Sequence, residues 1–260
     1  MKKLARLVKD DKIRGMKFSF VILTWNRHAF LEICLRALTE SLSKSHSYEI
    51  LVMNNNSSDR TTEVLELYQG QDRFRIFNAK KNLGLNAYKK LFKESQGDII
   101  VTVDDDILQF PKNFDLTFLE YMELFPDYGY FALNVVQDER TNGAKPGPEL
   151  YIDETRNGKT MQLGPAGGWC SCFRQRDFAK IRLRFKLFPL SMKHPEDGFI
   201  TWNFKNKLKL KCGVIKDAIC LHACGPFYAK QYDHLDREIA KYSKVGLKSI
   251  AAQYEKIKRQ

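Results

Sequence analysis

The sequence has no long apolar run, no secretion signal and no repeats. No apolar run approaches the roughly 20 residues that a helix needs to span a bilayer, so we expect no membrane-spanning segment. The start, Met1 to Asp10, is positively charged, but it lacks the apolar stretch and the small-residue cleavage site of a signal peptide. Internal repeats and low-complexity segments are also absent.

Cysteine is scarce, and its spacing excludes a disulfide-rich scaffold. Cys170 and Cys172 are too close in sequence for an easy mutual bridge. Cys220 and Cys224 lack a second ligand pair at zinc-finger spacing. We therefore expect reduced thiols that serve as small apolar residues, as is usual in a cytosolic protein. The six cysteines are Cys34, Cys170, Cys172, Cys212, Cys220 and Cys224.

Acidic residues are the minority among the charges. The chain has 43 Lys and Arg against 31 Asp and Glu, a net charge of +12. This surplus favours an anionic partner, namely nucleic acid, anionic lipid or a diphosphate substrate, and it does not choose among them. It suits a cytoplasmic enzyme that works at the inner face of a membrane. Hydrophobic residues make up 43% of the 260 positions, enough for one substantial core and too few for two full domains.

The first half alternates apolar β-type runs with helical patterns. We expect strands over 18–24, 48–53, 74–77 and 98–103, with helices over 28–43, 61–68 and 85–94. Consecutive β-α units predict an α/β protein with a mostly parallel sheet and helices on both faces. Polar segments follow three of the strands, at 24–27, 54–59 and 104–106. Because ligands bind beyond the carboxyl ends of such strands, these segments predict the functional site.

The second half is less regular. Residues 138–163 are rich in Gly, Pro and charge, which predicts a long connection or a mobile flap. We expect a strand over 169–173, a helix over 199–208, a strand over 211–215 and a mainly helical, basic segment over 228–258.

The triplet Asp104-Asp105-Asp106 directly follows an apolar run. Three adjacent carboxylates repel one another, so a crowded cluster needs positive charge. Magnesium or manganese supplies it and keeps open positions for phosphate oxygens. The alternative is a solvated acidic turn.

Five motifs in order resemble family 2 glycosyltransferases with the GT-A fold, and the similarity covers roughly residues 18–223. The motifs lie at 20–27, 49–61, 82–84, 103–106 and, as an acidic pair with a downstream histidine, at 196–197 and 221–222. The resemblance implies a single catalytic domain over 1–260 with a Rossmann-like, mostly parallel central sheet flanked by helices and a smaller acceptor-side subregion. Its parts would be a nucleotide-sugar-binding half (17–110), an acceptor and catalytic half (111–226) and a basic C-terminal helical segment (227–260).

The resemblance also implies a nucleotide site. Thr24, Asn26 and Arg27 would lie in the loop that cups the nucleoside. Asn54 stands where the family usually has an aspartate that reads the base, and its amide oxygen can still accept a hydrogen bond from a uracil or thymine N–H. Lys89 falls where an arginine commonly approaches the diphosphate, which keeps the charge but not the two-pronged geometry.

The acidic triplet matches the Asp-x-Asp motif of the family. Asp106 would bind Mn²⁺ or Mg²⁺ directly, with Asp104 on the ribose side and on the metal through water, and Asp105 among the nucleotide-binding residues. His222 would complete the metal shell, and its alternative is a core histidine. The donor would be a nucleotide sugar, most simply a UDP-sugar.

Asp197 matches the catalytic base of the family, and Glu196 would orient the base or the acceptor; the alternative for both is a helix N-terminus with acidic capping residues. The reaction would be one displacement with inversion. Gly167, Gly168 and Trp169 would form the floor under the sugar, unless they are a turn and a core tryptophan.

The acceptor is not identified: saccharide, lipid-linked and protein acceptors all fit, and surface glycan assembly follows from the resemblance alone. The cations of the C-terminal segment, from Lys230 to Arg259, form either a solvated face or a contact with anionic membrane. Two other functions compete. A sugar-nucleotidyltransferase usually opens with a glycine-rich basic loop, which 24–27 does not resemble. A noncatalytic nucleic-acid-binding protein would explain the charge but not the carboxylates, so we expect no nucleic-acid partner.

Overall fold

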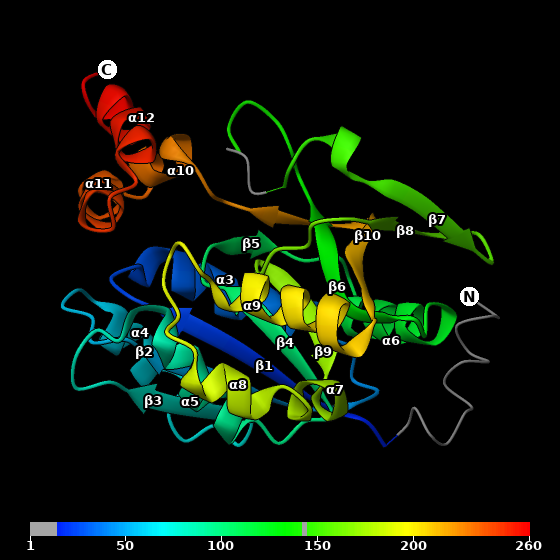
Figure 1. Ribbon diagram of the computed structural model, residues 1–260. Helices are drawn as coiled ribbons and strands as arrows, with labels where there is room; N and C mark the ends of the chain where they lie inside the picture. The colour runs from blue at the N-terminus through cyan, green and yellow to red at the C-terminus, as the bar shows by residue number, and fades with distance from the viewer. Residues whose placement is uncertain (1–14, 142–144) are drawn as a thin grey trace.

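The computed structural model describes residues 15–141 and 145–260 (Figure 1). The prediction that the chain start is not a secretion signal concerns residues 1–10, which lie outside these ranges. All six cysteines lie inside them, and none forms a disulfide, which confirms the prediction of free thiols. Within the same ranges, the structure has no helix with the length and apolar character needed to cross a membrane.

One mixed sheet of ten strands forms the centre of the described chain. The order along it is β3-β2-β1-β4-β9-β6-β10-β8-β7, and β5 pairs with β10 off this path. The strands are β1 Lys17–Thr24, β2 Ser47–Asn54, β3 Phe74–Asn78, β4 Ile99–Asp104, β5 Ile107–Gln109, β6 Tyr128–Val135, β7 Ile152–Arg156, β8 Lys159–Leu163, β9 Cys170–Arg174 and β10 Lys211–His222.

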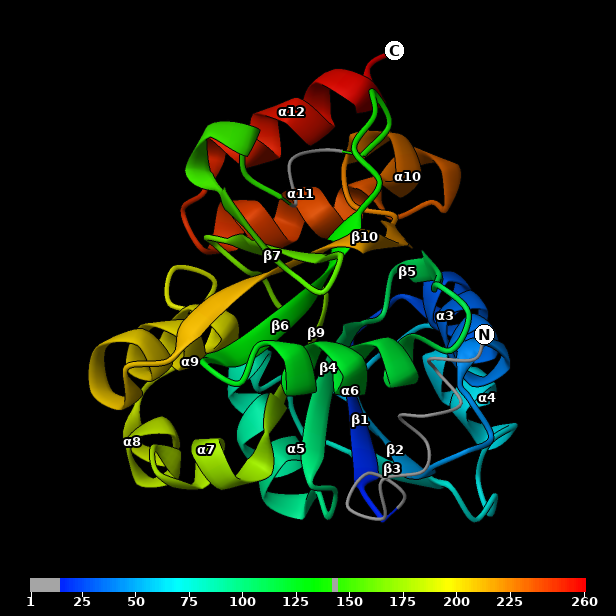
Figure 2. The ribbon, with the colours of Figure 1, turned by 90° about the vertical axis from the view of Figure 1, so that its right-hand side faces the viewer.

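Strands β3, β2, β1 and β4 are mutually parallel, as the alternating pattern predicts. Strands β1, β2 and β4 are mostly buried and mainly apolar, as expected where helices cover both sides of a sheet. Figures 1 and 2 show α6 (Phe114–Leu124) on one face and α5 (Tyr88–Glu94) on the other. The ring of Phe114 contacts Phe20 of β1, and Phe92 of α5 contacts Phe173 of β9.

The predicted helices of the first half are confirmed, with shifted ends: α3 is His28–Ser41, α4 is Thr61–Glu66, and α5 follows a 3-10 turn, η1 Gly84–Ala87. The second half contains α7 Gln175–Ala179, α8 Arg182–Leu187, α9 Glu196–Asn203 and the π-helical η3 Phe204–Leu208. The predicted helix over 199–208 therefore begins earlier, and the strand predicted at 211–215 continues as β10 to His222.

The prediction of a long connection or flap over 138–163 is wrong for its second part. After the short turn η2 (Pro148–Leu150), β7 and β8 form a hairpin, and β8 pairs with β10 at the sheet edge. The turn is Asn157-Gly158, and both residues have positive φ, 49° and 75°. An Asn-Gly pair with this backbone is the preferred two-residue hairpin turn, so the local signal was present in the sequence.

The basic segment predicted as mainly one helix is three short helices. They are α10 Pro226–Gln231, α11 Leu235–Lys244 and α12 Lys248–Lys258. Asp233 and Gly246 separate them, and both have positive φ, which ends a helix. In Figures 1 and 2 these helices lie at the opposite end of the molecule from α7 and α8.

Candidate active site

The acidic triplet lies where β4 ends and β5 begins. Asp104 is the last residue of β4, and its N–H donates to the carbonyl of Trp169 (2.8 Å). The short strand β5 then pairs antiparallel with the end of β10, where His222 lies opposite Ile107. The N–H of Ala223 donates to the carbonyl of Asp106 (2.9 Å). This pairing brings the end of β10 against the triplet.

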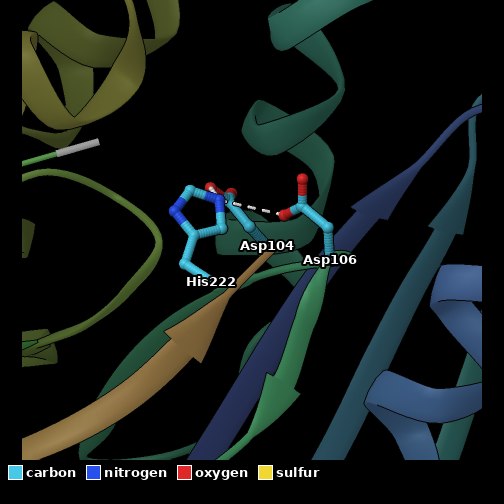
Figure 3. A group of neighbouring side chains, drawn as sticks. All are labelled: Asp104, Asp106 and His222. Carbon is cyan, nitrogen blue, oxygen red and sulfur yellow. Dashed lines mark ion pairs between the residues drawn. The ribbon is translucent and has the colours of Figure 1, made fainter. Parts of the chain in front are cut away.

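Asp104, Asp106 and His222 form one compact group of possible metal ligands (Figure 3). One atom of each lies within 4.8 Å of the others. The Nε2 of His222 is 3.0 Å from Asp106 Oδ1 and 3.5 Å from Asp104 Oδ2. His222 and Asp106 are buried, and the Asp104 side chain is 36% exposed, so the group is open on that side. Two carboxylates and one imidazole suit a divalent cation such as Mn²⁺ and leave it further positions for ligands.

The charges in this group depend on one another. Burial and the neighbouring Asp106 raise the pKa of Asp104 to about 7, while His222 opposes the shift. Burial disfavours the charge of Asp106, but Arg27 and His222 outweigh it and hold its pKa far below the usual range. Burial likewise opposes the His222 charge, and Asp106 outweighs it and raises the pKa of the imidazole. The crowded carboxylates are thus balanced by the Arg27 guanidinium and by proton binding at His222, a proton that a bound divalent cation would displace.

Arg27 supplies that guanidinium. Its Nη1 lies 3.0 Å from Asp105 Oδ1 and 2.6 Å from Asp106 Oδ2. Its Nη2 lies 2.6 Å from Glu238 Oε1 on α11. Burial opposes the charge, but Glu238 and the two aspartates raise the pKa of Arg27 well above its ordinary value. Arg27 therefore joins the triplet to the C-terminal helices. The predicted contact of Arg27 and Asp105 with a nucleotide stays a prediction.

Glu238 is the residue of this network that sequence reasoning missed. Its side chain is 2% exposed, accepts hydrogen bonds from Arg27 and Arg237 and forms an ion pair with Lys241. Arg237 also donates from Nε to the carbonyl of Trp25 (2.8 Å) in the loop after β1. Burial disfavours the Glu238 charge, but Arg27, Lys241 and Arg237 keep its pKa well below the usual value. Arg237 and Lys241 are therefore internal ion-pair partners and not part of a free basic face.

The loops after β1 and β2 are joined by hydrogen bonds. Asn26, with φ of 51°, accepts at Oδ1 from the N–H of Ser58 (2.7 Å). Its own N–H donates to Ser57 Oγ (2.9 Å). Asn54 accepts at Oδ1 from the N–H of Ser57 (3.0 Å). Thr24, the last residue of β1, is buried beside them. These residues therefore lie together at the carboxyl ends of β1 and β2, and their contact with a nucleotide stays a prediction.

Two predicted contacts stay predictions: a hydrogen bond between Asn54 and a nucleotide base, and an ion pair between Lys89 and a diphosphate. The amide nitrogen of Asn54 donates to Asn78 Oδ1 (3.2 Å) and to Thr62 Oγ1 (3.3 Å), so its orientation is fixed within the protein. Lys89 is half-buried in the first turn of α5.

Glu196 and Asp197 are the first two residues of α9. This position fits the predicted base and also the alternative, acidic capping residues at a helix N-terminus. Asp197 accepts at Oδ2 from the N–H of Gly168 (2.8 Å) and at Oδ1 from the N–H of Gly198 (2.5 Å). Burial raises the pKa of Asp197, and these backbone donors oppose the shift. Glu196 is buried, and burial and the adjacent Asp197 raise its pKa well above the usual value. Its Oε2 has no hydrogen-bond partner among the described residues.

The segment 167–169 lies between the acidic pair and the metal group. A Cβ at Gly168 would lie 3.3 Å from Glu196 Oε1, so the backbone approaches the acidic pair closely. At Gly167, a Cβ would overlap the ring of Trp169. The Trp169 indole is buried, donates to the carbonyl of Leu133 (2.8 Å) and stacks on His222. This environment fits the core tryptophan that the sequence left as an alternative, and the contact of 167–169 with a sugar stays a prediction.

A comparison with models of protein families identifies the family of the chain. A model described as glycosyl transferase family 2 matches residues 19–182. The chain belongs to glycosyltransferase family 2.

Curated relatives of this glycosyltransferase family 2 member match only in part. A dolichol-phosphate mannosyltransferase of Pyrococcus furiosus is 32% identical over 98 residues, 37% of this chain and 28% of the relative. The poly(ribitol-phosphate) beta-N-acetylglucosaminyltransferase TarS of Staphylococcus aureus is 24% identical over 93 residues, 35% of this chain and 16% of TarS. The chain thus spans less than a third of the length of either relative in these matches.

Solved structures confirm the GT-A fold of this family 2 member. A mannosyltransferase of Pyrobaculum calidifontis, in complex with GDP-Man and Mn²⁺, has a TM-score of 0.61 at 13% identity over 92% of this chain and 70% of that one. TarS residues 1–349 in complex with UDP-GlcNAc give a TM-score of 0.60 at 16% identity over 88% of this chain and 66% of that one.

The Glu238 network generates a first prediction, on stability. Replacing Glu238 by Gln leaves Arg27 and Arg237 without their shared carboxylate, which should lower the free energy of unfolding by about 3 kcal/mol. Urea denaturation of the full chain measures this. The matched control on the same helix is Asp236→Asn, whose carboxylate is 80% exposed and should cost less than about 0.5 kcal/mol. Equal effects of the two changes would contradict a role for the buried charge.

Proposed function

We propose that this family 2 member is a metal-dependent, inverting glycosyltransferase that uses a nucleoside-diphosphate sugar and a hydroxyl acceptor. The observation that carries the proposal is one backbone link. Residues 168–169 bond to Asp197 through the Gly168 N–H and to Asp104 through the Trp169 carbonyl. A possible metal group and a possible base are thereby fixed on either side of the same two residues, as donor activation and acceptor deprotonation require.

In this proposal Asp104, Asp106 and His222 would hold Mn²⁺ or Mg²⁺. A bound cation offsets the negative charge that develops on the leaving diphosphate. Thr24, Asn26, Asn54 and Lys89 are proposed to bind the nucleotide. A UDP-sugar is the proposed donor, which the UDP-GlcNAc complex of TarS supports, whereas the Pyrobaculum enzyme was solved with GDP-Man. The transferred group would be a hexosyl or N-acetylhexosaminyl unit.

Asp197 is proposed as the base. The acceptor oxygen forms a bond to the anomeric carbon, the bond from that carbon to the diphosphate breaks, and the acceptor proton passes to Asp197. The Gly168 and Gly198 N–H groups orient the carboxylate. Burial, which raises its pKa, makes it a better proton acceptor than an exposed aspartate. Burial and the charge of Asp197 also raise the pKa of the neighbouring Glu196, which disfavours a second negative charge beside the base.

The acceptor would be a saccharide, a lipid-linked saccharide or a protein, and surface glycan assembly is the proposed context. The family assignment favours sugar transfer over nucleotidyl transfer, and the paired carboxylates in the site disfavour a role limited to nucleic-acid binding.

Calorimetric titration with nucleotides tests the donor site. UDP should bind more tightly with Mn²⁺ present, and the Asp104→Asn variant should weaken this Mn²⁺-dependent binding at least tenfold because one of the proposed metal-site carboxylates is lost. Asp104 is suited to the test because its side chain is partly exposed and does not pair with Arg27. The exposed carboxylate of Glu63, changed to Gln, is the control. Binding of no nucleoside diphosphate in the presence of Mn²⁺ would refute the donor site.

The Asp197→Asn variant tests the base. Turnover should fall by about 10² to 10⁴ because an amide cannot take the proton, while UDP affinity should stay within twofold. Kinetics with the wild-type donor and calorimetry with UDP separate the two effects. Normal turnover by the variant would sink the assignment.

The pH dependence of transfer gives an independent check. Asp197 must be ionised to act as a base, and its pKa is raised above the ordinary aspartate value. The rate should therefore fall as pH decreases through this raised pKa, at a higher pH than for an exposed aspartate (about 3.9). A profile of kcat/KM against pH, measured where the fold is intact, reports this limb. An acidic limb at or below the ordinary value would argue against Asp197.

A further inference from the structure

A run of exposed cations lies in the segment from α7 to η3. Between residues 175 and 210 all nine Lys and Arg side chains are exposed. The three acidic residues of this segment neutralise little of this charge: Glu196 is buried, Asp197 faces Gly168, and the buried Asp177 pairs with one lysine. Among the described residues, only Lys180 of the nine forms an ion pair, with Asp177. We call the exposed side chains of α7, α8, α9 and η3 the cationic face.

Apolar side chains lie among these cations. Leu183 and Leu187, one helical turn apart on α8, are 70% and 73% exposed, and Trp202 on α9 is 54% exposed. The two helices lie side by side, since Phe185 and Phe188 of α8 both contact Phe199 of α9. Phe185 is buried, so the leucines occupy the outer side of α8. Figure 1 shows α8 and α9 adjacent on the same face of the molecule.

We propose that the cationic face binds the surface of an anionic lipid bilayer, with Leu183, Leu187 and Trp202 entering the interface. Exposed Lys and Arg attract anionic head groups, and aliphatic and indole side chains gain by leaving water at the boundary of the acyl chains. The long basic side chains extend toward the head groups while the apolar ones insert.

Other occupants fit these residues less well. A second copy of the same face would place like charges opposite each other, which opposes a symmetric dimer. Nucleic acid or another polyanion would bind the exposed cations, but contact with two exposed leucines would add little to its affinity. The C-terminal helices, the other candidate for membrane contact, have much of their charge neutralised internally. Arg237 and Lys241 pair with Glu238, Lys258 with Asp236, and Arg259 with Glu255.

Docking by this face has a consequence that rests on the proposed function. Helix α9 begins with Glu196 and Asp197 and continues into the cationic face at Trp202. A bilayer on that face would therefore lie close to the proposed base. This position suits an acceptor carried by a lipid, whereas a freely diffusing acceptor does not need it.

Co-sedimentation of the full chain with vesicles tests the proposal, in the absence of nucleotide and metal. The vesicles are phosphatidylcholine alone, or phosphatidylcholine with phosphatidylglycerol. We expect binding to the anionic vesicles only. The variant Lys205→Glu/Lys207→Glu should weaken it by about tenfold or more. The variant Leu183→Ser/Leu187→Ser should also weaken it, at unchanged charge. The charge-matched control, Lys244→Glu/Lys248→Glu at the opposite end of the molecule, should bind like the wild type.

Each other outcome overturns the proposal. No binding to anionic vesicles refutes it directly. Equal loss in the two lysine variants indicates only net charge, and loss in the control alone places the contact on the C-terminal helices. If the leucine variant binds normally, the face recognises phosphate without inserting, as a polyanion site would. All substituted side chains are exposed, so Tm and UDP titration of each variant separate a lost surface from a lost fold or donor site.

Discussion

The contact of Arg27 with the acidic triplet is the interaction on which the rest of the site depends. Three consecutive carboxylates at the end of a buried strand are unfavourable unless positive charge lies among them. Arg27 gives one guanidinium nitrogen to Asp105 and Asp106 and the other to Glu238. One oxygen of Asp106 is thereby held by Arg27 while the other is turned toward His222. A carboxylate oriented in this way is prepared to bind a cation, because partners outside the ligand shell fix the direction of the ligand.

The second constraint is the continuity of the backbone between the two halves of the site. The Asp104 N–H donates to the carbonyl of Trp169, the residue before β9, and the Gly168 N–H donates to the carboxylate of Asp197 on α9. A Cβ at Gly168 would lie 3.3 Å from Glu196 Oε1, a tight contact that would require the carboxylate to shift. A strand and a helix start are thus aligned by one bond between backbone groups and one bond from a backbone N–H to the Asp197 carboxylate. This is the kind of support that positions reacting groups to within a fraction of an ångström.

The parts that sequence predicted are those with local signals. Strands β1 to β4 could be predicted because continuous apolar runs mark strands that are buried on both faces. The triplet and His222 could be singled out because five motifs of the family occur in order. Glu238 gave no signal, since a glutamate in a polar, basic helix looks solvated, and its burial arises only from the packing of α11 against the loop after β1. The hairpin was missed although Asn157-Gly158 encodes it, because the charge and glycine content of the surrounding segment outweighed the dipeptide. Helix α6 and strand β6, between the two sets of motifs, were not predicted either.

The Arg27–Glu238 contact also bears on the order in which the chain is assembled during synthesis. Pairing of β1 with β4 brings Arg27 and the triplet together early, since both belong to the first half that leaves the ribosome. His222 and Glu238 both follow more than a hundred residues after the triplet. Strands β6, β9 and β10, which belong to the same sheet, precede Glu238 in the chain. Until the rest of the chain is made, the nascent first half therefore carries its acidic triplet without His222, and Arg27 without its Glu238 partner. A divalent cation bound at the triplet in this interval would offset the charge of the carboxylates before any substrate is met.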